Sequence, residues 1–436
     1  MSNYLKMQSK DLRNYHEYIL KRRNQEDLEI ENFINQAKLS LNDTKKCLCL
    51  KYLKIYHKIL LLVSDFKKNQ NSLIIFEYKA DKNQQENEST YEILKIDVDG
   101  ENYAEFNKNV DLQEAKLLVD NQERHLIIYN LNMIFYTKLE YIINNKTQIF
   151  NKEPTVTLKL LSNYFNQIPT PIYKQVSLSP YDQNLLISIN SENLFSIYSL
   201  NDEEYAFLYL LFPVNSFSFF SKLNPEEIIS FDYANQIGWN KYSIFFVSSY
   251  DRLYALSPII PKKGIIDLKE FKSLIANTKG ESAKFKKAKE LDTLNSLICN
   301  NSKLVKGNEY SYSFEKSDYP IARLQGPLNL TIHNKEQNSY NSFRLKIIEA
   351  NPMGILLISN RGICDLYITF ETVLPLFSDK NLTLELIEGE DPIDSLNIEL
   401  IKILTINIRK DEIQKNLELI YFFPLIMKSS FFAFVD

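Results

Sequence analysis

The sequence predicts an all-β fold, a β-propeller, and two observations indicate it. Short apolar runs rich in β-branched and aromatic residues recur along the chain, and three of them begin at Leu126, Leu185 and Ile244, 59 residues apart each time. A polar break and a second apolar run follow each one, so the repeating unit is a pair of strands. The chain has 436 residues, which is long for one hydrophobic core but suits blades that pack on their neighbours.

The second runs of these pairs are Met133–Thr137, Leu194–Leu200 and Leu253–Leu256. A fourth unit, Ile355–Ile358 followed by Ile363–Ile368, begins 111 residues after the third. The period is longer than that of compact propeller repeats, which predicts long connecting loops. A β-sandwich, or a pair of mixed α and β domains, would contain the same short strands. The period alone therefore excludes neither of these two alternatives to the propeller.

Two segments have helical periodicity instead. Residues 1–45 are highly charged, with apolar positions near helical spacing, and predict an N-terminal helical extension. Residues 266–299 place their apolar side chains on one face of two short predicted helices. The expected organisation is the extension followed by a propeller over residues 46–436, with a helical insert at 266–299.

Composition argues against several kinds of site. The chain has only 9 glycines and lacks G-x-G-x-x-G and G-x-x-x-x-G-K-[ST], so the common phosphate-binding loops are not expected. A formal net charge of -4 does not attract nucleic acid or anionic lipid. No apolar run approaches the ~20 residues of a membrane span. We therefore expect no direct nucleic-acid partner and no membrane insertion.

Cysteine and histidine patterns indicate neither metal nor catalysis. The four cysteines are Cys47, Cys49, Cys299 and Cys364. Their one close pair lacks a nearby histidine or second pair, so it resembles neither a disulfide framework nor a zinc site. A nucleophilic pair of Cys364 with His333 stays open, although a buried, inert thiol is the favoured interpretation for a cysteine in an alternating strand. We expect no enzyme activity, no catalytic residue, no cofactor and no metal.

Three further segments contain distinctive motifs. The first is GWNKYSIFFVSSYDRLYALSPIIP at 238–261, which includes Trp239, Tyr254, Leu256, Pro258 and Pro261. The second is YPIARLQGPL at 319–328, which includes Leu324, Gln325, Gly326 and Pro327. The third is VSLSPYDQNLLISINSENLFSIYSL at 176–200. Their residues, order and spacing resemble the N-terminal propeller of the nucleoporin eighty-eight family, called nucleoporin eighty-two in yeast.

These motifs have a structural interpretation. The two prolines of the first motif lack an N–H and fix φ, so they end a strand and turn the chain away from its sheet. Gly326 precedes a proline and is expected in an extended or left-handed conformation. The family usually has a glycine in the turn at Ser249–Arg252 and a cysteine at the position of Ser257, and this chain has neither.

The resemblance implies a seven-bladed propeller with an architectural function. It would hold a phenylalanine-glycine-repeat nucleoporin and the C-terminal domain of a nucleoporin ninety-eight relative at the cytoplasmic face of the nuclear pore complex, in the nuclear envelope. There it would serve mRNA export and nucleocytoplasmic protein transport. A propeller adaptor of a vesicle coat or of ciliary transport, and an enzyme with an unrecognised pocket, are the alternative functions.

The predicted insert also contains the strongest basic cluster, Lys284, Lys286, Lys287 and Lys289. One hypothesis makes these lysines a binding surface for RNA or for an acidic protein partner, which they would steer toward the propeller. The other makes them a solvated helix face, because no aromatic residue beyond Phe285 lies among them.

Overall fold

The protein is described here from a computed structural model. It describes residues 45–56, 58–65, 70–77, 90–98, 115–143, 155–163, 172–180, 184–200, 204–210, 226–234, 238–259, 263–267, 269–270, 272, 274, 302–306, 309–313, 322–331, 342–359, 363–373, 375–376, 386–388 and 398–407. The expected N-terminal extension lies outside these residues, except that Lys45 already begins strand β1. The chain divides into two compact units, Met1–Asn163 and Tyr164–Asp436.

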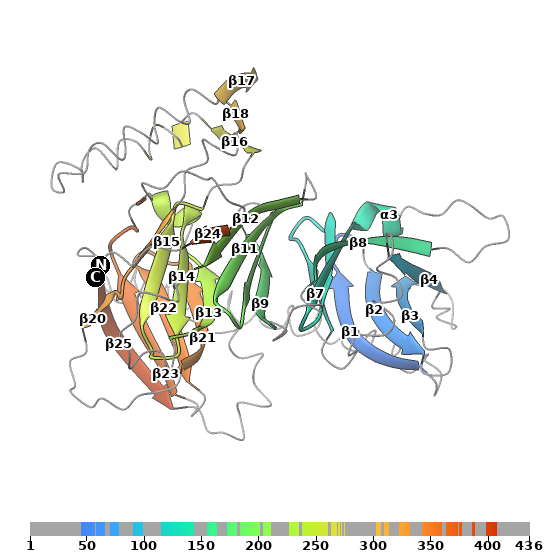
Figure 1. Cartoon of the computed structure of the whole chain (residues 1–436), viewed down its shortest axis with the longest axis horizontal. Coiled ribbons are helices and arrows are strands. Elements are labelled where there is room, and N and C mark those ends of the chain that lie inside the picture. The colour runs from blue at the N-terminus through green and yellow to red at the C-terminus, as the bar shows by residue number, and fades with distance from the viewer. Residues whose placement is uncertain are drawn as a thin grey trace, which may run out of the picture. The chain divides into compact units, whose positions relative to one another are not determined.

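The described strands of the first unit form one sheet in the order β1-β2-β3-β4-β8-β7-β6-β5. Their bounds are β1 Lys45–Leu53, β2 Lys58–Asp65, β3 Gln70–Glu77, β4 Thr90–Val98, β5 Lys116–Val119, β6 His125–Tyr129, β7 Met133–Lys138 and β8 Thr155–Asn163. Neighbours pair antiparallel except β4 and β8, which are parallel and join two four-stranded meanders. The short helix α3, Leu139–Ile143, follows β7 (Figure 1).

The second unit contains three blade-like sheets, each built on an antiparallel run of four strands (Figure 1). The strands of the first are β9 Tyr173–Leu178, β10 Leu185–Asn190, β11 Leu194–Ser199 and β12 Glu204–Leu210. Those of the second are β13 Ile228–Tyr233, β14 Ile244–Ser248, β15 Leu253–Ser257 and β19 Arg323–Gln325, with the 3₁₀ helix η3, Gly238–Tyr242, between β13 and β14. Those of the third are β21 Ser342–Ile348, β22 Met353–Ser359, β23 Ile363–Thr369 and β25 Glu399–Asn407.

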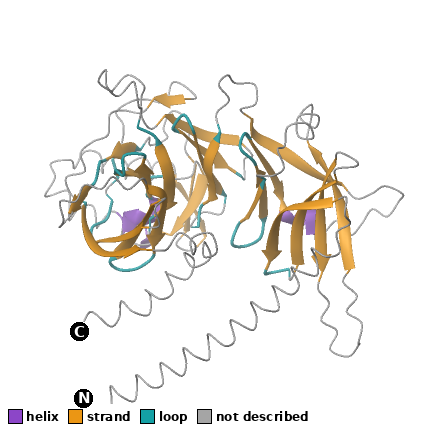
Figure 2. Ribbon diagram, turned by 90° about the horizontal axis from the view of Figure 1, so that it is seen from below, coloured by secondary structure: helices purple, strands orange, loops and turns teal. Residues whose placement is uncertain are grey.

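Short parallel strands extend two of these sheets. Strand β24, Leu386–Glu388, pairs with β12, and β20, Asn329–Thr331, pairs with β25. The described chain is almost entirely strands and turns (Figure 2), as the all-β prediction required. The number of blades stays a prediction.

The sequence repeat corresponds to the two middle strands of four antiparallel runs, each of four strands. The runs that begin at Leu126, Leu185, Ile244 and Ile355 lie in β6, β10, β14 and β22. The second runs lie in β7, β11, β15 and β23, and each pairs antiparallel with its predecessor. The predicted strand pairs are therefore confirmed as the middle strands of these runs.

The turn inside each pair carries a further repeated feature that the sequence analysis overlooked. In each pair, the last residue of the first strand or the residue directly after it has a side-chain oxygen that accepts backbone N–H groups of the turn. These residues are Asn130, Asn190, Ser248 and Ser359. Because the cap closes the turn locally, the second strand starts in a fixed register.

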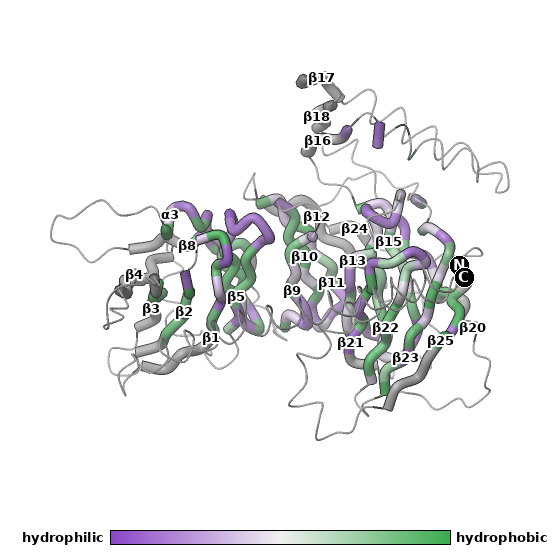
Figure 3. Tube along the Cα trace, turned by 180° about the vertical axis from the view of Figure 1, so that it is seen from behind, coloured by the Kyte–Doolittle hydropathy of each residue, from purple (hydrophilic) through white to green (hydrophobic). Residues whose placement is uncertain are grey.

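The central strands are buried on both faces, which explains why their sequences are apolar runs and not alternating patterns. Every residue of β10, β14, β15 and β22 is buried, and Figure 3 shows the hydrophobic colour along these strands. Between the first two sheets of the second unit, the Phe195 ring meets Phe231 and Phe246 edge-on, with centroids 6.2 and 5.3 Å apart. A sheet of this kind is stable only with neighbours on both sides.

Polar side chains join the first strands of these three sheets edge to edge. The Gln175 amide on β9 donates to the Phe231 carbonyl (2.8 Å) and accepts from the Phe231 N–H (3.0 Å) on β13. Asp232 accepts the N–H of Ile347 on β21 (2.8 Å) and pairs with Lys346 (2.8 Å). We call this line of contacts across β9, β13 and β21 the edge seam. It satisfies strand edges that would otherwise lack partners.

The start of the predicted helical insert needs a correction. Strand β16, Lys263–Asp267, includes Ile266 and Asp267, so the helix does not begin at 266. The described residues within 269–274 are helical, and the Asp267 carboxylate caps them by accepting the N–H groups of Lys269 (2.7 Å) and Glu270 (3.1 Å). Strand β16 joins β18, Glu309–Ser313, and β17, Ser302–Lys306, in a separate small sheet that the sequence did not predict.

We predict that Gln175→Ala lowers the free energy of unfolding by about 1–3 kcal/mol, because it removes the partners of two backbone groups in the edge seam. Urea unfolding monitored by circular dichroism measures the change. The matched control is Ser177→Ala on the same strand, whose hydroxyl donates to the adjacent Leu178 carbonyl and should contribute little to stability. Equal stabilities for the two variants would contradict a structural role for the seam.

Candidate interaction site

The first two motifs, at 238–261 and 319–328, are far apart in the sequence but contribute neighbouring strands to one sheet. Strands β15 and β19 pair antiparallel, with Ala255 opposite Gln325 and Leu256 opposite Leu324. Leu256, Leu324 and Gln325 are all buried. Beyond the ladder, the Leu328 N–H donates to the Leu253 carbonyl (2.8 Å). The second motif therefore supplies the fourth strand of the sheet to which the first belongs.

Gly326 lies where only glycine fits. Its φ is +132°, a conformation that L side chains rarely adopt. A Cβ atom there would be 2.8 Å from Tyr254 Cδ1 and 2.9 Å from the Leu253 carbonyl oxygen. Because Gly326 has no Cβ, the backbone of the Gln-Gly-Pro sequence can lie close to the Tyr254 ring. Pro327, the next residue, is exposed.

The opposite end of the Tyr254 side chain binds a buried acid. Its hydroxyl donates to Glu226 Oε1 (2.9 Å), which also accepts from Ser248 Oγ, while Arg252 Nη1 lies 3.3 Å from Oε2. The Glu226 side chain is only 3% exposed. Burial, and after it the neighbouring Glu226 carboxylate, raises the pKa of Tyr254, so the phenol stays a proton donor. The network links the signature strand to the segment that leads into β13.

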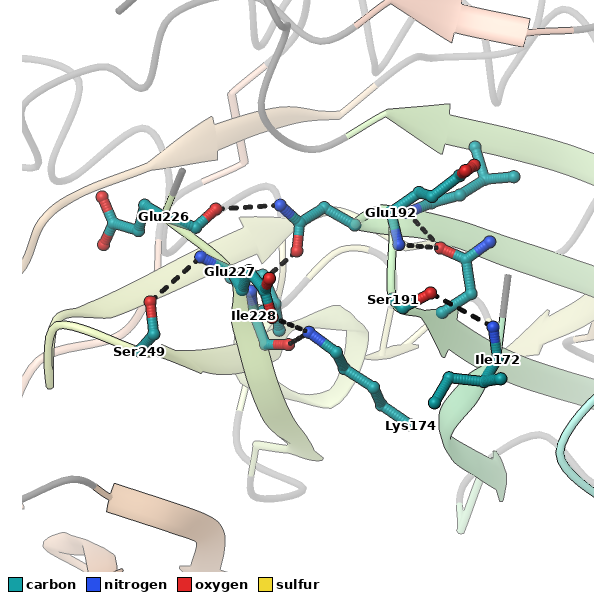
Figure 4. Close-up of polar contacts among 11 residues, drawn as sticks. Ile172, Lys174, Ser191, Glu192, Glu226, Glu227, Ile228 and Ser249 are labelled. Atoms are coloured by element: carbon teal, nitrogen blue, oxygen red, sulfur yellow. Dashed lines mark hydrogen bonds and ion pairs between the residues drawn. The ribbon is translucent and has the colours of Figure 1, made fainter. Parts of the chain in front are cut away.

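The segment Glu226–Ile228 is held from both sides by turns, as Figure 4 shows. The buried Asn193 amide donates to the Glu226 carbonyl (2.9 Å) and accepts the Ile228 N–H (2.8 Å). Ser249 accepts the Glu227 N–H through Oγ (3.1 Å) and donates its own N–H to the Glu227 carbonyl (2.7 Å). Lys174 adds an ion pair to Glu227 (2.7 Å).

We call the surface formed by Ile172, Lys174, Ser191–Asn193, Glu226–Ile228 and Ser249–Arg252 the turn cluster. Sequence reasoning did not select Glu226, which lies outside the three motifs, or Asn193, which lies within the third motif but has no distinctive role in its pattern. Their one available signal is position: Asn193 closes a turn between two repeat strands, and Glu226 directly precedes the following sheet.

The remaining signature residues stabilise the other end of the same sheet. Trp239 is buried in η3, and its carbonyl accepts from Ser243 Oγ (2.8 Å), which also contacts Ser257 Oγ (2.8 Å). Strand β15 ends at Ser257, directly before the buried Pro258, in keeping with a proline that closes the ladder. Pro261 lies outside the described residues.

The lysines at 284, 286, 287 and 289 also lie outside the described residues. The described beginning of their insert contacts η3 of the second unit. Glu270 binds Lys241 Nζ (2.6 Å) and accepts from the Tyr242 hydroxyl (3.3 Å), both in η3, and Leu274 is buried. In the described helical residues the apolar side chain is therefore covered.

Candidate catalytic and metal-binding groups show no such arrangement. Burial, and after it the neighbouring Asp365 carboxylate, raises the pKa of the Cys364 thiol to about 11, which disfavours a thiolate nucleophile. His333 lies outside the described residues, and His125 is buried with Nδ1 3.1 Å from the Tyr136 hydroxyl. In the described segments no group of His, Cys, Asp or Glu is placed to hold a metal ion. The helices described there are too short or too polar to span a bilayer.

We predict that Gly326→Val destabilises the fold by about 1–3 kcal/mol, because the new side chain would meet the Tyr254 ring and adopt an unfavourable φ. Thermal melting of the two proteins checks this. Gly326→Ala serves as the graded control, since it introduces the same backbone strain with a smaller side chain. An unchanged melting temperature for the valine variant would contradict the constrained-turn interpretation.

Comparisons with known proteins agree with the sheet organisation. No family model and no curated protein matches the sequence. Among solved structures, the yeast heterotrimeric Nup82–Nup159–Nup116 nucleoporin complex gives a TM-score of 0.57 at 12% identity, over 82% of this chain and 75% of that chain. The Chaetomium thermophilum complex of Nup82 NTD, Nup159 TAIL and Nup145N APD gives 0.56 at 13%, over 86% and 77%. The chain thus has a β-propeller fold like that in the Nup82 complexes, the fold that its sequence motifs predicted.

Proposed function

We propose that this chain is a non-catalytic scaffold of the nuclear pore complex that docks other nucleoporins. The observation that carries the proposal is the likeness to two heterotrimeric nucleoporin complexes over more than four fifths of the chain. The sequence motifs support it independently, because they resemble the same family and because the first two pair as β15 and β19 around Tyr254 and Gly326. A rigid propeller suits this role, since its loops and edges present many docking surfaces.

The finer function follows from the same resemblance. The partners would be relatives of Nup159 and of Nup116 or Nup145N, the proteins named with Nup82 in the two complexes. These correspond to the phenylalanine-glycine-repeat nucleoporin and the nucleoporin ninety-eight type domain expected from the sequence. The chain would act at the cytoplasmic face of the pore and support mRNA export without binding nucleic acid directly.

We expect nucleoporins to co-purify with the tagged full chain from extracts of its own cells. Mass spectrometry identifies the bound proteins, and an unrelated tagged propeller from the same cells serves as the control. Recovery of relatives of both partner types would support the proposal. A bound set of vesicle-coat or ciliary proteins without nucleoporins would contradict it.

We further propose that the lysines of the insert help to dock one of these partners. Replacing Lys284, Lys286, Lys287 and Lys289 with glutamate should leave the melting temperature nearly unchanged and weaken partner binding, with a loss that shrinks at high salt. Calorimetry with each purified partner measures the affinity. Unaltered binding of every partner would assign the insert a purely structural role as a cover.

A further inference from the structure

Each parallel strand pair in the described chain lies at the edge of an antiparallel run. The pairs are β4 with β8, β12 with β24 and β25 with β20. Strands β4, β8, β12 and β25 are each the fourth strand of their run, and we call the side of a fourth strand that faces away from the third its outer edge. Segments from distant parts of the chain add to these edges as parallel strands, which gives the N–H and C=O groups there hydrogen-bond partners.

The outer edge of β25 is covered in this way over only part of its length. Strand β25 has nine residues, Glu399–Asn407, and β20 pairs with the first three of them (Figure 1). In the part of the chain that the structure describes, no strand pairs with this edge from Lys402 to Asn407, although β23 pairs with the other side. We call residues 402–407 the distal edge. It is about as long as a typical strand.

An exposed apolar side chain lies near the start of the distal edge. Ile403 is 49% exposed. The register between β25 and β23 shifts at this residue, because Lys402 is opposite Tyr367 whereas Leu404 is opposite Leu366. Ile403 is therefore the extra residue of a β-bulge. From Leu404 onward the register is regular again, so the bulge disturbs the strand only at this point.

The lysine beside Ile403 does not protect the distal edge. Edge strands commonly carry a lysine whose charge prevents pairing with a further strand. The Lys402 ammonium, however, lies 2.9 Å from Asp365 Oδ1 and 6.0 Å from the centroid of the Tyr367 ring. Both of these partners belong to β23, so the side chain extends toward the interior of the sheet and away from the outer edge.

We propose that the distal edge of β25 binds an extended segment of a partner protein as a further parallel strand, in line with β20. The backbone of the segment pairs with residues 402–407, and one of its apolar side chains packs on Ile403. The segment is rich in β-branched or aromatic residues and uncharged opposite Ile403, because that side chain is apolar and the Lys402 charge is already paired. This inference rests on the proposed scaffold function, since it names one way in which a docking partner binds.

The parallel direction follows from continuity with β20 and from the other strands that add to outer edges in the described chain. It also distinguishes a partner segment from a second copy of this chain. A two-fold axis between two copies would pair β25 with β25 antiparallel. Self-association through this edge is therefore a different outcome, which the test has to detect.

The test selects peptides that bind the full chain from a displayed library of random sequences of about 10 residues, the length of a short docking strand. Ile403→Lys is the counter-selection variant, because a lysine at an exposed edge position opposes strand pairing. The selected peptides should be rich in β-branched and aromatic residues, and their affinity for this variant should be about tenfold lower. Phe370→Lys is the matched control, since Phe370 is 70% exposed and lies after β23, outside β25. It should leave the affinity unchanged.

N-methylation of a selected peptide distinguishes strand addition from contact through side chains alone. Alternate residues of an added parallel strand direct their N–H and C=O groups toward the neighbouring strand. Methylating the N–H groups of one alternate set should therefore abolish binding, whereas methylating the other set should have little effect. A photo-crosslinker at the C-terminus of the peptide should label β25 near Asn407, as the parallel direction requires. This comparison uses the unaltered chain, so it decides the outcome even if Ile403→Lys fails to fold by circular dichroism.

Hydrogen exchange identifies the other possible occupants of the edge. Some N–H groups at 402–407 should exchange quickly in the chain alone and become protected when the peptide binds. Slow exchange of all of them without peptide would show that another segment of this chain covers the edge. A dimer that Ile403→Lys dissociates in analytical ultracentrifugation would assign the edge to a second copy. Either result overturns the proposal.

The binding data can contradict the proposal in three further ways. It is wrong if no selected peptide distinguishes the full chain from Ile403→Lys, or if Phe370→Lys weakens binding equally. It is also wrong if both methylated peptides still bind, or if the C-terminal crosslinker labels β25 near Lys402, since the strand would then be absent or antiparallel.

The outcomes also separate this inference from the proposed function. Nucleoporins that co-purify with a chain that selects no peptide contradict the distal-edge proposal alone. Strand-forming peptides that bind a chain that recovers no nucleoporin would contradict the pore assignment and leave the docking edge in place.

Discussion

The amide of Gln175 takes the place of a neighbouring strand for Phe231, and the second unit depends on bonds of this kind. Each of its three blade-like sheets has a central strand that is buried along its whole length, so none of these sheets is complete alone. Apolar packing stabilises the contact between the sheets but provides no hydrogen-bond partners for the N–H and C=O groups at their edges. Ser230 continues the seam, since its hydroxyl donates to Gln175 Oε1 (2.9 Å) and accepts the Leu345 N–H (3.3 Å). Side-chain amides, hydroxyls and carboxylates thus set the alignment of sheets that the apolar core alone would leave free to slide.

The central strands could be predicted because burial on both faces gives them continuous apolar sequences. The edge strands were harder. In strand β9 only Tyr173 and Val176 are buried, and the half-buried Gln175 has no sequence feature that distinguishes it from a surface glutamine. The outer strand β19 has only three residues and joins its sheet after a long insertion, so neither its length nor its place in the chain reveals the pairing. Only the Leu-Gln-Gly-Pro motif marked it.

The candidate site divides in the same way. Gly326, Tyr254 and Leu324 were found because they form a recognisable motif, and the structure gives the motif a cause: glycine admits the ring, and the ring reaches Glu226. The Asn193 amide binds backbone groups 33 and 35 residues away in the sequence, and the Glu226 carboxylate binds side chains 22 to 28 residues away. Such contacts depend on how sheets are placed side by side, and a single sequence carries no local sign of them.

Three turns of this glycine-poor chain place a residue other than glycine at positive φ, and two of these turns belong to the turn cluster. In three turns the carbonyl of one residue accepts the N–H of the third residue after it, and that third residue has φ between +53° and +61°. Glycine is the usual occupant of such a position. Here the occupants are Glu123, Asn193 and Asp251, the last in the turn where the resembling family usually has glycine.

The strain of a side chain at positive φ is small for Asn and Asp and larger for Glu, and local caps offset it. What glycine lacks is a side chain that reaches another segment. Asn193 uses its amide to hold Glu226–Ile228, and Glu123 uses its carboxylate to accept the N–H of Ile55 in the turn after β1 (2.9 Å). At these two turns, a residue other than glycine therefore adopts a less favourable backbone conformation, and its side chain makes a contact with a neighbouring segment that glycine could not make. The turn that contains Glu192 has such a contact, because the Asn193 amide binds Glu226 and Ile228, and a glycine at position 193 could not make it.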